Sequence, residues 1–184
     1  IVFDKTGTLT KAQPKVVDVV SFDGREPDEL LRIAACLEEH FPHSMAKAVV
    51  KSAIEKNLQH DEMHTKVEYL VAHGISTTIN DVRVIIGSYH FIFEDEKCII
   101  PEGKEALFES LPPEYSQLYL AIDGKLAAVI CIEDPVRQEA QAVVNSLRKA
   151  GLSKIVMMTG DSDRTASAIA KRVGVDEYYS EVLP

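Results

Sequence analysis

Two short polar motifs each follow an apolar run, and their residue types are suited to phosphate chemistry. Asp4 comes directly after apolar residues 1–3, and a threonine–glycine–aspartate triplet follows apolar residues 155–158. In an open α/β sheet, ligands bind at the carboxyl ends of the strands. A carboxylate in that position can attack a phosphoryl group, and backbone N–H groups around a glycine can bind phosphate oxygens. The candidate catalytic residues are Asp4, Lys5, Thr6, Thr159, Gly160 and Asp161.

The second motif offers two further groups for such a site. The Thr159 hydroxyl could donate to a phosphate oxygen, and the Asp161 carboxylate could organise a metal ion or a water. Either motif alone could be no more than a strand-terminal turn with an acidic cap. Two such motifs in one chain favour a phosphate site over that simpler interpretation.

The apolar periodicity predicts that both motifs belong to one parallel sheet. Residues 1–3 and 155–158 have the composition of buried strands, and helices are predicted over 134–150 and 165–173. A glycine directly follows each helix, as is typical of helix C-termini. Strands and helices in this order indicate a parallel, Rossmann-like α/β sheet with right-handed crossovers.

The middle of the chain has a different pattern. Helices are predicted over 28–39 and 45–56, with Ser44 as the N-cap of the second. Short strands follow, and the residue pairs at 80–81 and 123–124 are typical of two-residue hairpin turns. The middle segment is therefore predicted to be α+β with an antiparallel sheet. The predicted strands cover 67–72, 75–79, 82–86, 118–122 and 126–132.

These patterns divide the chain into two domains. With 184 residues, the chain has enough interior for two small cores. A parallel α/β domain, 1–16 with 132–184, is split by an α+β domain, 17–131.

Composition excludes some classes of function. The formal net charge of −9 leaves no basic stripe that could bind nucleic acid. Cys36, Cys98 and Cys131 are scattered, so they predict buried thiols in a reducing compartment and neither a disulfide framework nor a zinc site. No run approaches the roughly 20 apolar residues that span a bilayer.

The first motif carries a resemblance to a known family. The seven residues from Asp4 to Thr10 resemble, letter for letter, the phosphorylation motif of P-type ATPases. The resemblance implies that Asp4 accepts the γ-phosphate of ATP as an acyl phosphate, with Mg²⁺ held by Asp4 and Thr6. It also implies a haloacid-dehalogenase-type phosphorylation domain that is split by a nucleotide-binding domain. The 159–161 triplet is similar to the family's second phosphate-site motif.

A further stretch is similar to the family's hinge motif. It is the Asp-Pro-Val-Arg sequence at 134–137, which lies between the two phosphate motifs. On this resemblance we place Asp134 and Arg137 among the residues that serve the nucleotide site.

The inserted domain points to the heavy-metal subgroup of these pumps. The six residues from His43 to Ala48 are similar to the subgroup's His-Pro-Leu-Ala-Lys-Ala stretch, where the histidine lies near adenine. Ser44 stands where proline is usual, and His40 is a competing candidate for the role of His43. Glu38 matches a glutamate that hydrogen-bonds the adenine amino group. A solvated charge at a helix end is the simpler interpretation of Glu38.

Two glycines complete the expected nucleotide site. Gly74 matches the second glycine of the family's Gly-x-Gly loop, whose first position here is Ala72, and Gly87 matches a later glycine near the nucleotide. The expected nucleotide-site residues are Glu38, His43, Gly74, Gly87, Asp134 and Arg137.

Two rival functions must be weighed against a pump, and the residue type at position 6 argues against one of them. Phosphatases of the same fold carry a second aspartate two residues after the nucleophile, and Thr6 cannot do general acid–base work near neutral pH. This favours a long-lived acyl phosphate over a soluble phosphohydrolase that uses the insertion as a cap. A non-catalytic nucleotide-sensing module is the other rival.

The resemblance also implies parts that this chain lacks. In the family, an aspartate-rich loop that binds Mg²⁺, transmembrane helices and an actuator domain lie elsewhere in the polypeptide. We therefore expect a cytoplasmic portion of a cell-membrane protein that binds ATP or ADP but phosphorylates weakly or not at all in isolation. An exposed edge of its parallel sheet could allow dimerisation.

Overall fold

The computed structural model describes residues 1–39, 43–58, 67–70 and 74–182. It separates into two compact units. Unit 1 contains residues 1–14, 112–116 and 133–184, and unit 2 contains residues 15–111 and 117–132. The two units are described in turn.

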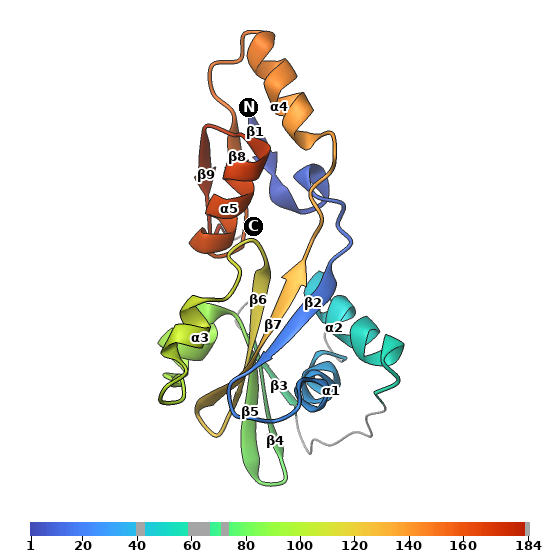
Figure 1. Cartoon of the computed structure of the whole chain (residues 1–184), viewed down its shortest axis with the longest axis vertical. Helices are drawn as coiled ribbons and strands as arrows, with labels where there is room; N and C mark the ends of the chain where they lie inside the picture. The colour runs from blue at the N-terminus through green and yellow to red at the C-terminus, as the bar shows by residue number, and fades with distance from the viewer. Residues whose placement is uncertain (40–42, 59–66, 71–73, 183–184) are drawn as a thin grey trace. The chain divides into compact units, whose positions relative to one another are not determined.

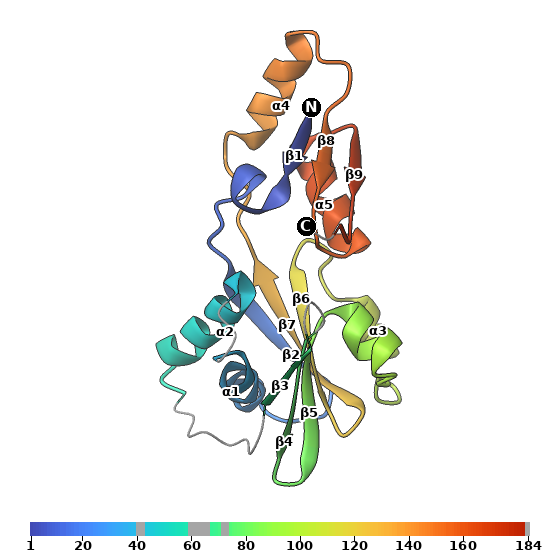
Figure 2. The same cartoon turned by 180° about the vertical axis from the view of Figure 1, so that it is seen from behind.

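Unit 1 is built on a three-stranded parallel sheet, which confirms the expected parallel α/β fold. Its order is β1 (Val2–Asp4), β8 (Val156–Met158) and β9 (Glu177–Tyr179). The register sets Asp4 level with Met158. Figures 1 and 2 show the helices α4 (Ala140–Lys149) and α5 (Asp163–Val173) beside this sheet. Their apolar faces and the strands share one core, whose fully buried members include Val144, Ile155, Met157, Ala166 and Val173.

Helix α4 begins later than the sequence predicts. The expected helix over 134–150 starts only at Ala140. Residues before it are extended, because Thr10 and Val136 form an antiparallel bridge and Lys11 N donates to the Pro135 carbonyl at 3.0 Å. Tertiary pairing with the segment after Asp4 thus overrides the local helix signal of Asp134-Pro135. The predicted end of the helix is correct, since Gly151 has a φ of 96°.

Unit 2 contains a six-stranded sheet covered by helices. The strand order is β2-β7-β6-β5-β4-β3, and β4 is antiparallel to both β3 and β5. Helices α1 (Pro27–Glu38) and α2 (Ser44–Glu55) lie on one side of this sheet, and α3 (Glu105–Glu109) lies on the other (Figures 1 and 2). The strands are β2 (Lys15–Ser21), β3 (Val67–Leu70), β4 (Gly74–Ile79), β5 (Val82–Gly87), β6 (Ser116–Ile122) and β7 (Lys125–Glu133).

Both predicted hairpin turns are present. Asn80 and Asp81 have φ values of 50° and 63°, and Asp123 and Gly124 have 51° and 71°. Two consecutive positive φ values define the turn type whose twist matches paired strands. Four elements had no predicted counterpart: β2, β9, α3 and the helical turn η2 (His90–Asp95).

The three cysteines are buried, as expected. Burial raises the pKa of the Cys98 thiol, and the nearby Glu96 carboxylate raises it further. Among the described residues, no helix is long and apolar enough to cross a membrane.

Asp176 gives unit 1 a predictable response to acid. Its carboxylate accepts hydrogen bonds from Ile155 N at 2.8 Å and from Arg148 at 2.7 Å. The Ile155 N–H, followed by the Arg148 guanidinium, holds the pKa of Asp176 below its ordinary value. A lowered folded-state pKa stabilises the fold above the unfolded pKa, near about 4, and this contribution is lost as pH falls through the folded pKa.

We therefore expect Asp176→Asn to make the free energy of unfolding less dependent on pH below about pH 4. Urea unfolding at a series of pH values measures this dependence. Asp81→Asn, at an exposed hairpin turn, is the matched control. If the free energy of unfolding of Asp176→Asn fell as steeply below about pH 4 as that of the unchanged chain, the lowered pKa of Asp176 would not be the cause of the acid response.

Candidate functional site

The first polar motif lies at the end of β1, with Asp4 exposed. No described residue forms a hydrogen bond or ion pair with its carboxylate. Because Asp4 is level with Met158 on the adjacent parallel strand, Thr159 and the residues after it follow at the same sheet edge. The structure therefore brings the two predicted phosphate motifs together.

The loop after Asp4 is held in shape by its own residues. Gly7 has a φ of 82°, a backbone conformation that residues with a side chain rarely adopt. Its N–H donates to Thr10 Oγ1 at 3.1 Å, and Thr10 N donates to the Lys5 carbonyl at 3.0 Å. Thr6 and Gly7 are exposed, so a phosphate can approach the loop at these two residues.

Lys5 is directed into unit 1 and is only 4% exposed. Its ammonium pairs with Asp161 Oδ2, and the Thr159 hydroxyl donates to that oxygen at 2.8 Å. The other oxygen, Asp161 Oδ1, accepts from the Ser116 hydroxyl at 3.0 Å. The carboxylate of Asp161 is thus engaged by three protein groups, and a role in organising a metal ion or a water stays a prediction. No local sequence pattern marks Ser116 as a partner of Asp161.

Asp134 and Arg137 also contact the loop after Asp4. The Thr10 hydroxyl donates to Asp134 Oδ2, and Gln13 N donates to Oδ1 at 3.1 Å. Arg137 donates from Nε to the Thr8 carbonyl at 3.0 Å and from Nη2 to the Gly7 carbonyl at 3.2 Å. These contacts place both residues at the phosphate-site loop, and their role at the nucleotide site stays a prediction.

In unit 2, the end of α1 meets the start of α2 through Glu38 and His43. Glu38 is 2% exposed, and its Oε2 lies 3.1 Å from His43 Nε2. His43 Nδ1 accepts from Ala46 N at 3.3 Å, so His43 is the N-cap of α2. The prediction that Ser44 caps this helix is therefore wrong by one residue. His40 lies outside the described residues.

Glu38 Oε2 remains short of a hydrogen bond. The approach of His43 is close enough for an ion pair but is poorly aligned, and no described residue donates a hydrogen bond to this buried oxygen. A buried acceptor without a donor is costly. This oxygen is therefore suited to an N–H donor from a ligand, and the structure contradicts the view of Glu38 as a solvated charge.

Gly74 and Gly87 face each other across β4 and β5. Gly74 has no positive φ, but a Cβ there would lie 2.4 Å from the Phe91 ring and 2.5 Å from the Ile86 carbonyl oxygen. Close packing thus requires glycine at this position. No described hydrogen bond or ion pair joins this pair to Glu38 or His43, and Ala72 lies outside the described residues.

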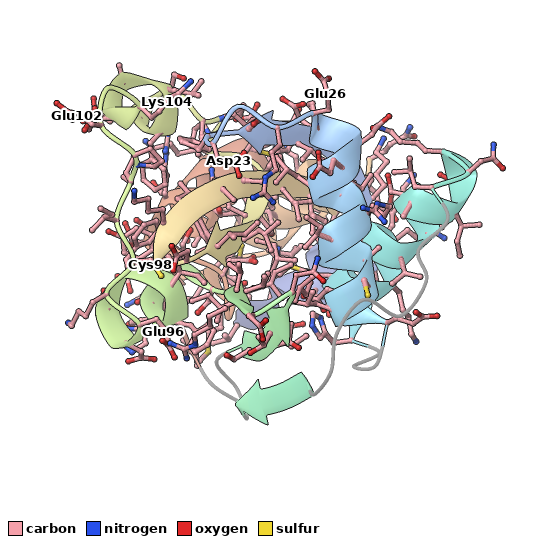
Figure 3. All side chains as sticks on the ribbon, turned by 90° about the horizontal axis from the view of Figure 1, so that it is seen from below. Asp23, Glu26, Glu96, Cys98, Glu102 and Lys104 are labelled. Atoms are coloured by element: carbon pink, nitrogen blue, oxygen red, sulfur yellow. The ribbon has the colours of Figure 1, made fainter. Side chains whose placement is uncertain are left out.

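A hollow of about 600 Å³ lies elsewhere in unit 2. Figure 3 shows this side of the molecule, with Asp23 on the loop before α1 and Lys104 at the start of α3. None of the predicted site residues lines the hollow. Its lining residues are Phe22, Asp23, Gly24, Arg25, Val82, Pro101, Glu102, Lys104, Ile122, Asp123, Lys125 and Ala127.

Comparisons with known proteins agree with the phosphate motifs. A family model described as haloacid dehalogenase-like hydrolase matches residues 1–183. The chain is 35% identical to Copper-transporting ATPase 2 of Rhizobium meliloti over 190 residues, covering 100% of this chain and 22% of that protein. It resembles the crystal structure of a zinc-transporting PIB-type ATPase with a TM-score of 0.67 and 29% identity, over 100% of this chain and 29% of that one.

A third comparison concerns part of the chain. The crystal structure of an N-domain from a copper-transporting P-type ATPase matches with a TM-score of 0.52 and 26% identity, covering 66% of this chain and 99% of the N-domain. The chain spans about a quarter of the length of the curated relatives it matches, 22% of the copper transporter and 25% of a zinc exporter.

Proposed function

Because the chain belongs to the haloacid dehalogenase-like hydrolase family and its relatives are heavy-metal P-type ATPases, we propose that it binds ATP and accepts the γ-phosphate on Asp4 as part of such a pump. In this proposal unit 1 is the phosphorylation domain and unit 2 is the nucleotide-binding domain. Both belong to the cytoplasmic part of an integral membrane protein.

The contrast between two carboxylates carries the proposal. Asp4 is exposed and has no described partner, whereas Asp161 is held by Lys5, Thr159 and Ser116. A nucleophile must have a free lone pair to attack phosphorus. Both oxygens of Asp4 meet that requirement without a competing contact from a described residue, whereas each oxygen of Asp161 is already engaged by a protein group.

The Asp4 loop is also suited to phosphate. Two carbonyls of the loop, those of Gly7 and Thr8, accept hydrogen bonds from the Arg137 guanidinium, which also places a positive charge at the loop. Gly7 places no side chain over the exposed backbone beside Asp4. The hydroxyl of the exposed Thr6 is then the loop group that we expect to contact phosphoryl oxygens.

Mg²⁺ fits the donor set at this loop. It binds one or two carboxylates together with substrate phosphate oxygens, and Asp4 is an exposed carboxylate with no competing partner. Asp4 and Thr6 would hold the ion. When bound, Mg²⁺ neutralises charge on the transferring phosphoryl group.

The adenine is assigned to Glu38 and His43. The buried Glu38 oxygen without a donor matches the exocyclic amino group of adenine, and His43 lies beside it on the N-terminus of α2. The similarity of an isolated N-domain to 66% of this chain supports the assignment of unit 2 to nucleotide binding.

Nucleotide titrations of Glu38 variants test the proposal. A hydrogen bond to a charged acceptor contributes about 1.5–3 kcal/mol, so Glu38→Gln is expected to weaken ATP binding about tenfold or more. ITP lacks the amino group, and the unchanged chain should therefore bind it more weakly than ATP. A glutamine amide can donate to the inosine oxygen, so Glu38→Gln should lose or reverse the preference for ATP.

The titrations are followed by NMR amide shifts at Glu38, His43, Gly74 and Gly87. Glu39→Gln, which changes the adjacent exposed carboxylate, serves as the control and should retain the preference for ATP. Equal binding of ATP and ITP by the unchanged chain would sink the assignment of Glu38 to adenine. Shifts confined to Asp4 and Thr159 would favour a phosphohydrolase-like site.

A further inference from the structure

Residues 112–116 are a short excursion of the chain into unit 1. Leu111 before them and Gln117 after them belong to unit 2. Two side-chain hydrogen bonds hold the excursion to unit 1. The Ser116 hydroxyl donates to Asp161 Oδ1 at 3.0 Å, and the buried Thr165 hydroxyl donates to the Tyr115 carbonyl at 3.1 Å.

Ser116 controls the orientation of the Asp161 carboxylate, which Lys5 and Thr159 do not fix by themselves. Lys5 and Thr159 both contact Oδ2 of Asp161, while Ser116 is the described side-chain donor to Oδ1. The torsion that rotates an aspartate carboxylate is broad, so contacts to one oxygen leave the plane of the group poorly defined. A donor on the second oxygen fixes that plane.

The position of the Asp161 carboxylate determines the position of Lys5. A buried ammonium must stay with its counter-charge, because an unpaired charge is strongly disfavoured in the protein interior. Lys5 is 4% exposed and has Asp161 as its ion-pair partner. Any rotation of the carboxylate therefore moves the Lys5 side chain.

Lys5 in turn anchors Asp4. Asp4 ends β1 with an exposed side chain, while the side chain of the next residue is buried. Lys5 begins the helical turn η1 (Lys5–Leu9), so its buried side chain anchors the backbone at the residue directly after Asp4. The carbonyl of Lys5 also accepts from Thr10 N, which closes the loop.

We propose that Ser116 is a positioning residue for phosphoryl transfer, acting through Asp161 and Lys5 on the orientation of Asp4 and its loop. This inference rests on the proposed function. Ser116 touches neither the nucleophile nor the phosphate, and its effect is on rate and not on nucleotide binding.

The first test observes the Lys5 ammonium directly by ¹⁵N NMR of the 184-residue chain. Ser116→Ala should shift and broaden this signal and speed its hydrogen exchange about tenfold, the factor that corresponds to losing one hydrogen bond in the network. Ser116→Thr keeps the hydroxyl and should restore the signal. Ser146→Ala, which removes a hydroxyl bonded to the Ala142 carbonyl on α4, is the control and should leave it unchanged.

The second test measures phosphoenzyme formation in the complete polypeptide that carries this chain. Ser116→Ala should lower the formation rate about tenfold with unchanged ATP affinity, and Ser116→Thr should recover it. An unchanged Lys5 signal, or an equal change in Ser146→Ala, would overturn this inference alone. Absence of phosphoenzyme in the unchanged protein would overturn the proposed function and this inference with it.

Discussion

Replacing Asp4 with asparagine is expected to reduce phosphoenzyme formation from ATP by at least about 10⁴-fold, as loss of a covalent nucleophile does in other enzymes. The amide has nearly the shape of the carboxylate but cannot form an acyl phosphate. Asp4 is exposed and has no described partner, so the free energy of unfolding should change by less than about 0.5 kcal/mol.

The measurement is acid-stable ³²P incorporation from γ-labelled ATP into the complete polypeptide. Nucleotide binding by Asp4→Asn should match that of the unchanged chain, because the residues assigned to adenine lie in unit 2. Asp81→Asn removes the same charge at a hairpin turn and should keep full incorporation. Label retained in Asp4→Asn would place the phosphate acceptor on another residue.

A methyl group at Gly74 is expected to destabilise unit 2 by about 2–3 kcal/mol, at the upper end of what overpacking costs. The added Cβ would lie 2.5 Å from the Ile86 carbonyl oxygen, which belongs to a paired strand and cannot swing away as a flexible side chain can. It would also lie 2.4 Å from the Phe91 ring, which is 1% exposed. Both neighbours are fixed, so the strand itself must move.

Urea unfolding of Gly74→Ala measures this effect. Gly24→Ala is the matched control, because a Cβ at Gly24 meets no atom within 4 Å and only its φ of 87° opposes a side chain. The control should cost about 1 kcal/mol. Equal losses in the two variants would show that close packing does not make glycine necessary at position 74.

Local patterns predicted the elements whose signals lie within a few residues. The strand before Asp4, the two hairpin turns and the glycines that end α4 and α5 each depend on neighbouring residues, and all are present. Because parallel strands align their carboxyl ends, the meeting of Asp4 with Thr159 also followed from sequence.

Contacts between distant segments account for two of the errors, and a local side-chain contact accounts for the N-cap of α2. The segment at 134–137 has a helix-start composition but is extended, because residues 9–11 offer it backbone partners. His43 displaced Ser44 as N-cap because its imidazole reaches Ala46 N. Ser116 lies 45 residues from Asp161, so no sequence spacing could reveal their hydrogen bond.

The insertion of unit 2 into unit 1 determines the order in which the chain can fold during synthesis. β1 leaves the ribosome before all of unit 2, yet Val2 pairs with Val156, which follows unit 2. Unit 2 is complete once β7 has emerged, and β8 begins 23 residues after β7 ends, roughly 1–5 s later at ordinary translation rates. Unit 2 can therefore be folded while β1 is still unpaired. Thr10 and Val136 flank the insertion and form a bridge. Once unit 2 is folded, the flexible chain between them is short, so less conformational entropy is lost when β1 pairs with β8.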